Sequence, residues 1–256
     1  MSDPRYAELF QLTSVVSLVF QISATTLIAM LSFAVARTGR RREMLYFSGG
    51  WTCYAAALVY ILLVAQIPVA ARVLLFGYYF FEYAAVLLFF AGCRYTATAK
   101  APPGSARWAL VPAAAAALAL ALAPAPFFWM FALHTTVVGL AWIACLIALW
   151  PAVRRPGAGA GVRIVAIGLA LLAVDYLHHL PTGWYISAQH LSLSAYYYTI
   201  DSLVDGMLDF VLGFGTVVII LDIERGELAV ANARLKAASD RTQQALHTVP
   251  LTAVLN

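Results

Sequence analysis

Residues 198–221 read YTIDSLVDGMLDFVLGFGTVVIIL, and residues 222–247 read DIERGELAVANARLKAASDRTQQALH. The first stretch is almost wholly apolar. At a rise of about 1.5 Å per residue, it is long enough to cross about 30 Å of hydrocarbon. The second stretch is charged and rich in Ala, Gln and Arg. The junction at Leu221 therefore predicts a membrane-spanning helix that continues into a helix outside the membrane.

The composition of the whole chain favours the same class of protein. Of its 256 residues, 63% are hydrophobic and 11% are charged, and the mean hydropathy is +0.83. A soluble domain carries about 25% charged residues. This composition excludes a soluble globular enzyme, a disordered protein and a nucleic-acid binder. The net charge of +4 lies in short loops between apolar runs, as in membrane proteins.

Seven segments are long and apolar enough to be transmembrane candidates. They are Leu12–Ala36, Met44–Gln66, Ala71–Cys93, Trp108–Ala125, Phe127–Trp150, Arg163–Leu180 and Tyr198–Leu221. The fourth is the weakest, because Pro124 and Pro126 end it and Pro112 lies in its first turns. The predicted fold is an all-α membrane protein, a seven-transmembrane helix bundle that continues into a cytoplasmic coiled-coil helix.

Positive charge alternates between the loops. Arg and Lys gather in the first, third and fifth loops, at Arg37, Arg40, Arg41, Arg42, Arg94, Lys100, Arg107, Arg154, Arg155 and Arg163. The second loop has only Arg72, and the fourth and sixth have neither residue type. The positive-inside rule then predicts a multi-pass protein of the bacterial inner membrane, with its N-terminus outside and its C-terminus cytoplasmic.

Carboxylates inside a membrane are costly and are functional candidates by default. Counted from the nearest cytoplasmic charge, Glu82 and Asp175 lie about 18 Å deep, Asp209 about 20 Å and Asp205 about 25 Å. The first three thus share one depth on three different helices. Asp175 and His179 also share a helix face, because they are four residues apart.

Histidines and aromatic residues are expected further outward than these carboxylates. Together they predict a pocket for a small ligand in the outer half of the bundle, lined by Glu82, His134, Asp175, His179, Trp184, Tyr185, Asp205 and Asp209. His178 lies about 100° round the helix from His179, so the two are not expected to face one site. The alternative is structural: polar side chains in membranes often only hydrogen bond helices together, and Tyr and Trp form interfacial belts.

Cofactors can be weighed from the residue types present. His134, His178 and His179 are suitable ligands for a metal or haem, although no HxxxH pair occurs. Sensing of protons by the His–Asp cluster is a comparable hypothesis. Retinal is not expected, because it needs a lysine in the membrane and the two lysines, Lys100 and Lys236, lie in a loop and in the tail.

The tail has a seven-residue repeat. Leu221, Leu228 and Leu235 are seven residues apart, and the second seam position is occupied by Glu224, Ala231, Ala238 and Ala245. This spacing predicts a short signalling coiled coil that forms a homodimer together with the last transmembrane helix. The alternative is an unpaired amphipathic cytoplasmic helix.

The last residues, His247-Thr-Val-Pro-Leu-Thr-Ala-Val-Leu-Asn256, resemble the opening of a GGDEF diguanylate cyclase domain, which reads H-T-D-P-L-T-G-V-L-N-R. Val249 and Ala253 stand where that family has Asp and Gly. The same residues also look like the segment after the phospho-acceptor of some sensor histidine kinases, where Ala245 would occupy the acceptor position, or like the entry of a PAS domain. The upstream part, Asp175–Pro181 with the aromatic loop and last span, looks like multi-span sensor regions of such receptors.

These observations predict three regions: a transmembrane sensor domain over 1–221, a cytoplasmic signalling coiled coil over 222–247, and the start of an output domain over 248–256. The expected function is the sensory part of a dimeric bacterial receptor, with no catalytic residue in this chain. The resemblance implies that the output is synthesis of cyclic di-GMP from GTP. The alternatives are the input domain of a sensor histidine kinase, or a membrane transporter or enzyme that uses the Asp/His cluster.

Overall fold

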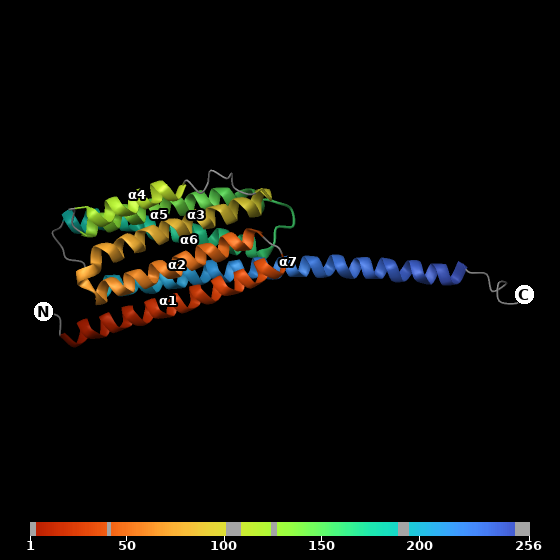
Figure 1. Ribbon diagram of the computed structural model, residues 1–256, viewed down its shortest axis with the longest axis horizontal. Helices are drawn as coiled ribbons and strands as arrows, with labels where there is room; N and C mark the ends of the chain where they lie inside the picture. Colours follow the sequence, from red (N-terminus) through yellow and green to blue (C-terminus); the bar gives the residue numbers. More distant parts are fainter. Residues whose placement is uncertain (1–3, 40–41, 101–108, 124–126, 189–194, 249–256) are drawn as a thin grey trace, which may run out of the picture.

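A computed structural model describes residues 4–39, 42–100, 109–123, 127–188 and 195–248, and all regular structure in these ranges is helical. The elements are α1 (Pro4–Gly39), α2 (Arg42–Gln66), the 3-10 turn η1 (Pro68–Ala70), α3 (Ala71–Thr98), α4 (Leu110–Leu122), α5 (Phe127–Val153), α6 (Ala160–Ala188) and α7 (Ala195–Thr248). The helices pack nearly side by side, and α7 extends far beyond the rest (Figure 1).

Six of the helices form a closed ring. Each contacts two neighbours in the order α1, α2, α3, α5, α6, α7 and back to α1. The seventh, α4, packs on the outside of the ring against α3. Side chains from all six ring helices therefore point toward one shared interior.

The six ring helices are long and apolar enough to cross a membrane, which fits a multi-pass membrane protein. Within the described residues α4 has only 13 residues, about 20 Å at the α-helical rise, which is too short for a helical span. The predicted helical span Trp108–Ala125 is therefore not confirmed. The helix ends because Ala123 has a ψ of 133° directly before Pro124, as the residue before a proline prefers.

One end of the bundle carries the cationic loops. The guanidinium of Arg155, just after α5, donates to the carbonyl of Ala97 near the end of α3. The amide of Gly161 at the start of α6 donates to Asp222 Oδ2 of α7 at 2.9 Å. These contacts place the ends of α3, α5 and α6 at the level where α7 leaves the bundle. We call this the cationic end, and the opposite one the distal end.

Helix α6 is longer than the sequence predicts. The expected span Arg163–Leu180 lies within it, and the helix continues through Pro181 to Ala188. Pro181 is exposed on the surface of the helix. Proline is tolerated within a membrane helix where other groups satisfy the freed carbonyl. Trp184 and Tyr185 consequently lie on a helix, and both are exposed.

A layer of aromatic rings fills the interior toward the cationic end. The ring centroid of Phe89 lies 5.0 Å from that of Trp51, 5.4 Å from that of Trp142 and 6.0 Å from that of Phe47. All four side chains are buried. The layer joins α2, α3 and α5, and the small polar side chains of Ser32, Ser48 and Thr216 are also buried toward the cationic end.

Helices α6 and α7 approach closely at glycines. A Cβ atom added at Gly215 of α7 would lie 2.8 Å from the backbone nitrogen of Val165, and one at Gly168 of α6 would lie 3.1 Å from the Cα of Leu212. Small residues permit this backbone contact in membrane helices. The two helices are thus held in one register where α7 approaches the cationic end.

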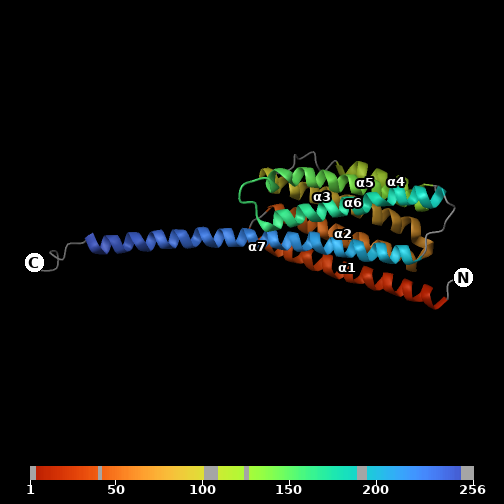
Figure 2. The same cartoon turned by 180° about the vertical axis from the view of Figure 1, so that it is seen from behind.

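Helix α7 is one continuous helix of 54 residues. From Glu224 to Thr248 the helix extends about 38 Å beyond the bundle, at about 1.5 Å per residue, and its side chains are exposed from Glu224 to Gln244 (Figure 2). The heptad leucines Leu221, Leu228 and Leu235 are 48%, 61% and 69% exposed. The helical continuation of the tail is confirmed, whereas its pairing into a coiled coil stays a prediction.

Candidate functional site: a buried polar network beside a cavity

A cavity of about 270 Å³ lies inside the helix ring. Its polar lining consists of Gln21, Tyr54, Tyr78, Tyr79, Glu82, Tyr176, Ser202 and Asp205. Its apolar lining consists of Leu18, Leu58, Ile61, Leu75 and Phe131. All six ring helices contribute residues to the lining, so a change in their relative positions changes the shape of the cavity.

The cavity lies in the distal half of the bundle. Leu75 and Phe131 are each four residues inside the first residue of α3 and α5, and Ile61 lies near the last residue of α2. These helix ends are opposite the cationic end. The position agrees with the pocket that the sequence predicts for the half of the bundle away from the cationic loops.

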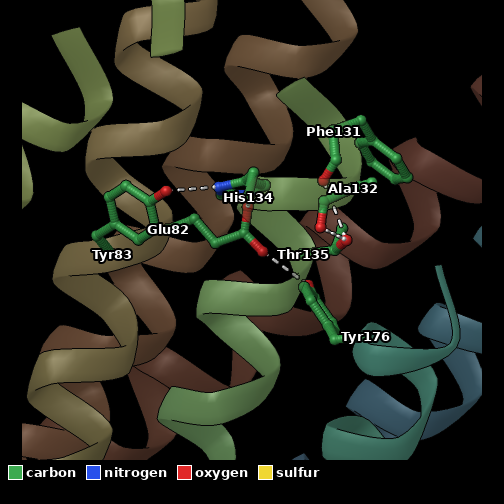
Figure 3. A network of polar contacts seen from close by, with 7 residues as sticks. All are labelled: Glu82, Tyr83, Phe131, Ala132, His134, Thr135 and Tyr176. Carbon is green, nitrogen blue, oxygen red and sulfur yellow. Dashed lines mark hydrogen bonds and ion pairs between the residues drawn. The ribbon is translucent and has the colours of Figure 1, made fainter. Parts of the chain in front are cut away.

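Glu82 of α3 is the centre of the polar network (Figure 3). The Nε2 of His134 on α5 donates to Glu82 Oε2 at 2.7 Å, and the hydroxyl of Tyr176 on α6 donates to Glu82 Oε1 at 2.7 Å. The other ring nitrogen of His134, Nδ1, is hydrogen bonded to the hydroxyl of Tyr83 at 3.1 Å. One carboxylate thus joins three neighbouring helices of the ring.

Complete burial explains why this network is so fully paired. The side chains of Glu82 and His134 are both 0% exposed. A charge buried without partners is strongly destabilising, whereas a charge with a partner and hydrogen bonds is tolerated. The rings of Tyr78 and Tyr79 also pack around His134, with centroids 5.3 Å and 4.5 Å from its ring.

The network continues across the interior to α7. The side chain of Tyr54 on α2 interacts with those of Tyr176 and Asp209. Asp209 is 5% exposed, and its Oδ2 has no hydrogen-bond partner among the described residues. His134, Glu82, Tyr176, Tyr54 and Asp209 therefore form a chain of polar side chains from α5 to α7.

Helix α1 is tied to α7 at the cavity. Gln21 Nε2 donates to the carbonyl oxygen of Ser202 at 2.7 Å and to the hydroxyl of Ser17 at 3.2 Å. Gly206, one turn further along α7, lies directly against the side chain of Gln21. A displacement of the distal part of α7 must therefore break or move the contacts of Gln21.

The predicted site residues separate into three groups. Glu82 and Asp205 line the cavity, and His134 and Asp209 are buried directly behind its wall. His179 is buried with its ring 4.9 Å from that of Phe131, which lines the cavity. Asp175 has a buried Oδ2 without a hydrogen-bond partner and lies within electrostatic range of Asp209. Trp184 and Tyr185 are 66% and 57% exposed and do not line it.

One expectation about the histidines is wrong. His134 lies level with Glu82 rather than further outward, because α3 continues past Arg94 to Thr98 and so places Glu82 further from the cationic end. The ring centroids of His178 and His179 are 4.2 Å apart, but the His179 side chain is buried and that of His178 is 37% exposed. No three His, Cys, Asp or Glu side chains of the described residues are placed to hold a metal ion. The predicted metal ligands His134, His178 and His179 therefore do not form such a set.

Sequence reasoning missed most of the cavity wall, because only Glu82 and Asp205 of its lining residues were predicted. Tyr54, Tyr78, Tyr79 and Tyr176 resemble ordinary core residues when only one sequence is considered. Gln21 had a usable signal, because Ser17, Gln21 and Thr25 repeat every four residues and mark one helix face. All three are buried, which confirms that this face of α1 points inward.

Searches of protein-family models, of curated proteins and of solved structures find no match to this chain. Residues 249–256, which carry most of the resemblance to the GGDEF opening, lie outside the described residues. The geometry thus defines a helical membrane protein with a distal polar cavity and a long projecting helix.

Proposed function

We propose that this chain is the membrane sensor domain of a dimeric bacterial signalling receptor. A small ligand in the distal cavity changes the arrangement of α7, and the tail of α7 transmits that change to a cytoplasmic output domain. By the resemblance of residues 247–256, the output is synthesis of cyclic di-GMP, with histidine kinase signalling as the alternative output.

The observation that carries this proposal is the continuity of α7. The same unbroken helix contributes Ser202 and Asp205 to the cavity and continues to Thr248 outside the bundle. A rigid helix transmits a rotation or translation along its whole length. A ligand shifts such an equilibrium only by its difference in affinity for the two arrangements, so it must contact a part that moves. Ser202 and Asp205 supply that contact.

The charge distribution supports the orientation that the proposal needs. The described residues Arg37, Arg42, Arg94, Arg154, Arg155 and Arg163 belong to helix ends at the cationic end, from which the tail also leaves. By the positive-inside rule this end faces the cytoplasm of the inner membrane. Helix α3 ends at this end and α5 begins at the distal end, so the two helices run antiparallel to α2 and α6, respectively.

The interior supports a receptor rather than a transporter. A transport path needs polar groups or water across the full depth of the membrane. Between Glu82 and the cationic loops, the aromatic layer of Phe47, Trp51, Phe89 and Trp142 packs between α2, α3 and α5 instead. This packing favours a binding site over a continuous transport path.

Insertions in the tail test the proposed function. The chain is fused after Asn256 to a GGDEF domain, and cyclic di-GMP is measured in cells. Two residues inserted between Gly226 and Glu227 rotate the downstream helix by about 200°, whereas seven residues restore its phase almost completely. We expect the first insertion to change output at least fivefold and the second to return it to the parental level. Output that is independent of the inserted length would contradict the proposal.

A further inference from the structure

The wall of the distal cavity also indicates what kind of molecule it takes. Two carboxyl groups, Glu82 and Asp205, line it, and none of its described lining residues is Lys or Arg. Asp205 lies within electrostatic range of the hydroxyls of Tyr54, Tyr78 and Tyr176. Carboxylate and aromatic groups therefore surround the same space.

This combination disfavours anions and simple apolar ligands. An anion would meet two carboxyl groups with no cationic side chain of the lining to balance them. A purely apolar ligand would remove water from Asp205 without replacing its hydrogen bonds, which is costly. A cation offsets that cost and also gains from the negative faces of aromatic rings, an attraction that strengthens when water is excluded.

The two carboxyl groups have different roles. The side chain of Glu82 is 0% exposed and joins α3 to α5 and α6 through His134 and Tyr176. Asp205 is only half-buried on α7 and lines the cavity. Because Asp205 is the more accessible of the two, it is the group that meets the charge of a bound molecule, and Tyr78 and Tyr79 provide the adjoining aromatic wall.

The volume limits the size of the ligand. A cavity of about 270 Å³ corresponds to about nine water molecules at about 30 Å³ each. It is slightly smaller than the pockets of about 300–1,000 Å³ that hold drug-sized ligands. The apolar lining from Leu18, Leu58, Ile61 and Leu75 favours a hydrocarbon body attached to the charged group.

We infer that the distal cavity binds a small organic ammonium cation with an apolar body, held by the carboxylate of Asp205 and the faces of Tyr78 and Tyr79. The inference rests on the proposed function only in treating this cavity as the place where the stimulus acts. Because Asp205 belongs to α7, the cation contacts the helix that continues into the tail.

Titration calorimetry on the full chain in detergent tests the inference with three probes of one shape: benzylammonium, benzyl alcohol and benzoate. Titrations into protein-free micelles correct for partition. We expect saturable binding of benzylammonium, at least tenfold weaker binding of benzyl alcohol, and no binding of benzoate. No saturable binding of benzylammonium, or equal or tighter binding of either other probe, would overturn the inference.

Two pairs of variants test whether benzylammonium binds at this cavity. Asp205→Asn should weaken benzylammonium binding at least tenfold, while Glu224→Gln, the same kind of charge loss on the exposed tail of α7, should leave it unchanged. A second pair tests the aromatic wall at Tyr79, which lines the cavity: Tyr79→Phe should bind as the parent does, and Tyr79→Leu about tenfold more weakly. Asp205→Asn and Tyr79→Leu proteins that bind as the parent does would overturn the inference.

The two proposals fail in different ways. If benzylammonium binds more tightly than benzyl alcohol and benzoate, but cyclic di-GMP output does not change with tail insertions, the receptor function is contradicted and the cation site is supported. Output that depends on helix phase, with no binding of benzylammonium, overturns the cation site alone.

Discussion

At the residue scale, the molecule is organised around Glu82. Its two oxygens accept hydrogen bonds from α5 and α6, and Tyr54 extends the network to Asp209 on α7. In a closed ring of helices, such a group holds neighbours at fixed distances without filling the adjoining cavity. The sequence indicated the depth of Glu82, but the partners of a buried carboxylate depend on helix packing that one sequence does not reveal.

The first prediction concerns the contribution of this carboxylate to stability. Glu82→Leu leaves His134 and Tyr176 buried without their acceptor, and each unsatisfied group costs about 1–3 kcal/mol. We expect the free energy of unfolding, measured by titration with denaturing detergent, to fall by at least about 2 kcal/mol. Glu82→Gln keeps an acceptor oxygen and should lose less than half as much. A Leu variant as stable as the parent would contradict the central role of Glu82.

At the element scale, α7 consists of two parts with different surroundings. Up to about Ile220 it packs against α1 and α6, and from Glu224 to Gln244 it is exposed. Two of its glycines lie in these two environments. Gly215 is in contact with the backbone of α6, while an added Cβ at Gly226 would meet nothing within 4 Å.

The second prediction compares these glycines. Gly215→Ala forces α7 away from Val165, and overpacking of this kind costs about 1–3 kcal/mol of unfolding free energy. Gly226→Ala makes no clash and favours the helix by about 0.5–1 kcal/mol, so amide exchange over the tail should slow severalfold. Denaturation measures the first effect, and hydrogen exchange measures the second. A Gly215→Ala protein with unchanged stability would show that α6 and α7 do not approach closely.

At the scale of the whole molecule, most of the fold was predictable from hydropathy. Six of the seven expected spans correspond to helices long enough to cross a membrane. The differences have local causes: α4 ends directly before Pro124, and α6 continues through Pro181 beyond the expected span. The cavity lies in the half where the sequence predicts a pocket, but its tyrosines and Gln21 were not predicted, and Trp184 and Tyr185 do not line it. Hydropathy predicts how deep a residue lies in the membrane. Which side of a helix faces its neighbour depends on side-chain packing between the helices.

The third prediction concerns orientation in the membrane. Single cysteines at Val69, between α2 and α3, and at Lys100, after α3, lie at exposed positions at opposite ends of the bundle. In intact bacterial spheroplasts, an impermeant maleimide should label Val69→Cys and leave Lys100→Cys unlabelled until the membrane is opened. The background has Cys53, Cys93 and Cys145 changed to Ala. The reverse pattern of labelling would contradict the proposed cytoplasmic cationic end.

The central claim is that the tail of α7 pairs with that of a second copy, and disulfide formation in native membranes measures this most directly. With a cysteine at one position at a time in the same cysteine-free background, oxidation should give high yields of covalent dimer at Leu228, Ala231 and Leu235, which share the predicted seam. Val230 and Ala233, on the outer face, should give low yields. Equal yields at all five positions, or no dimer at any, would contradict the account.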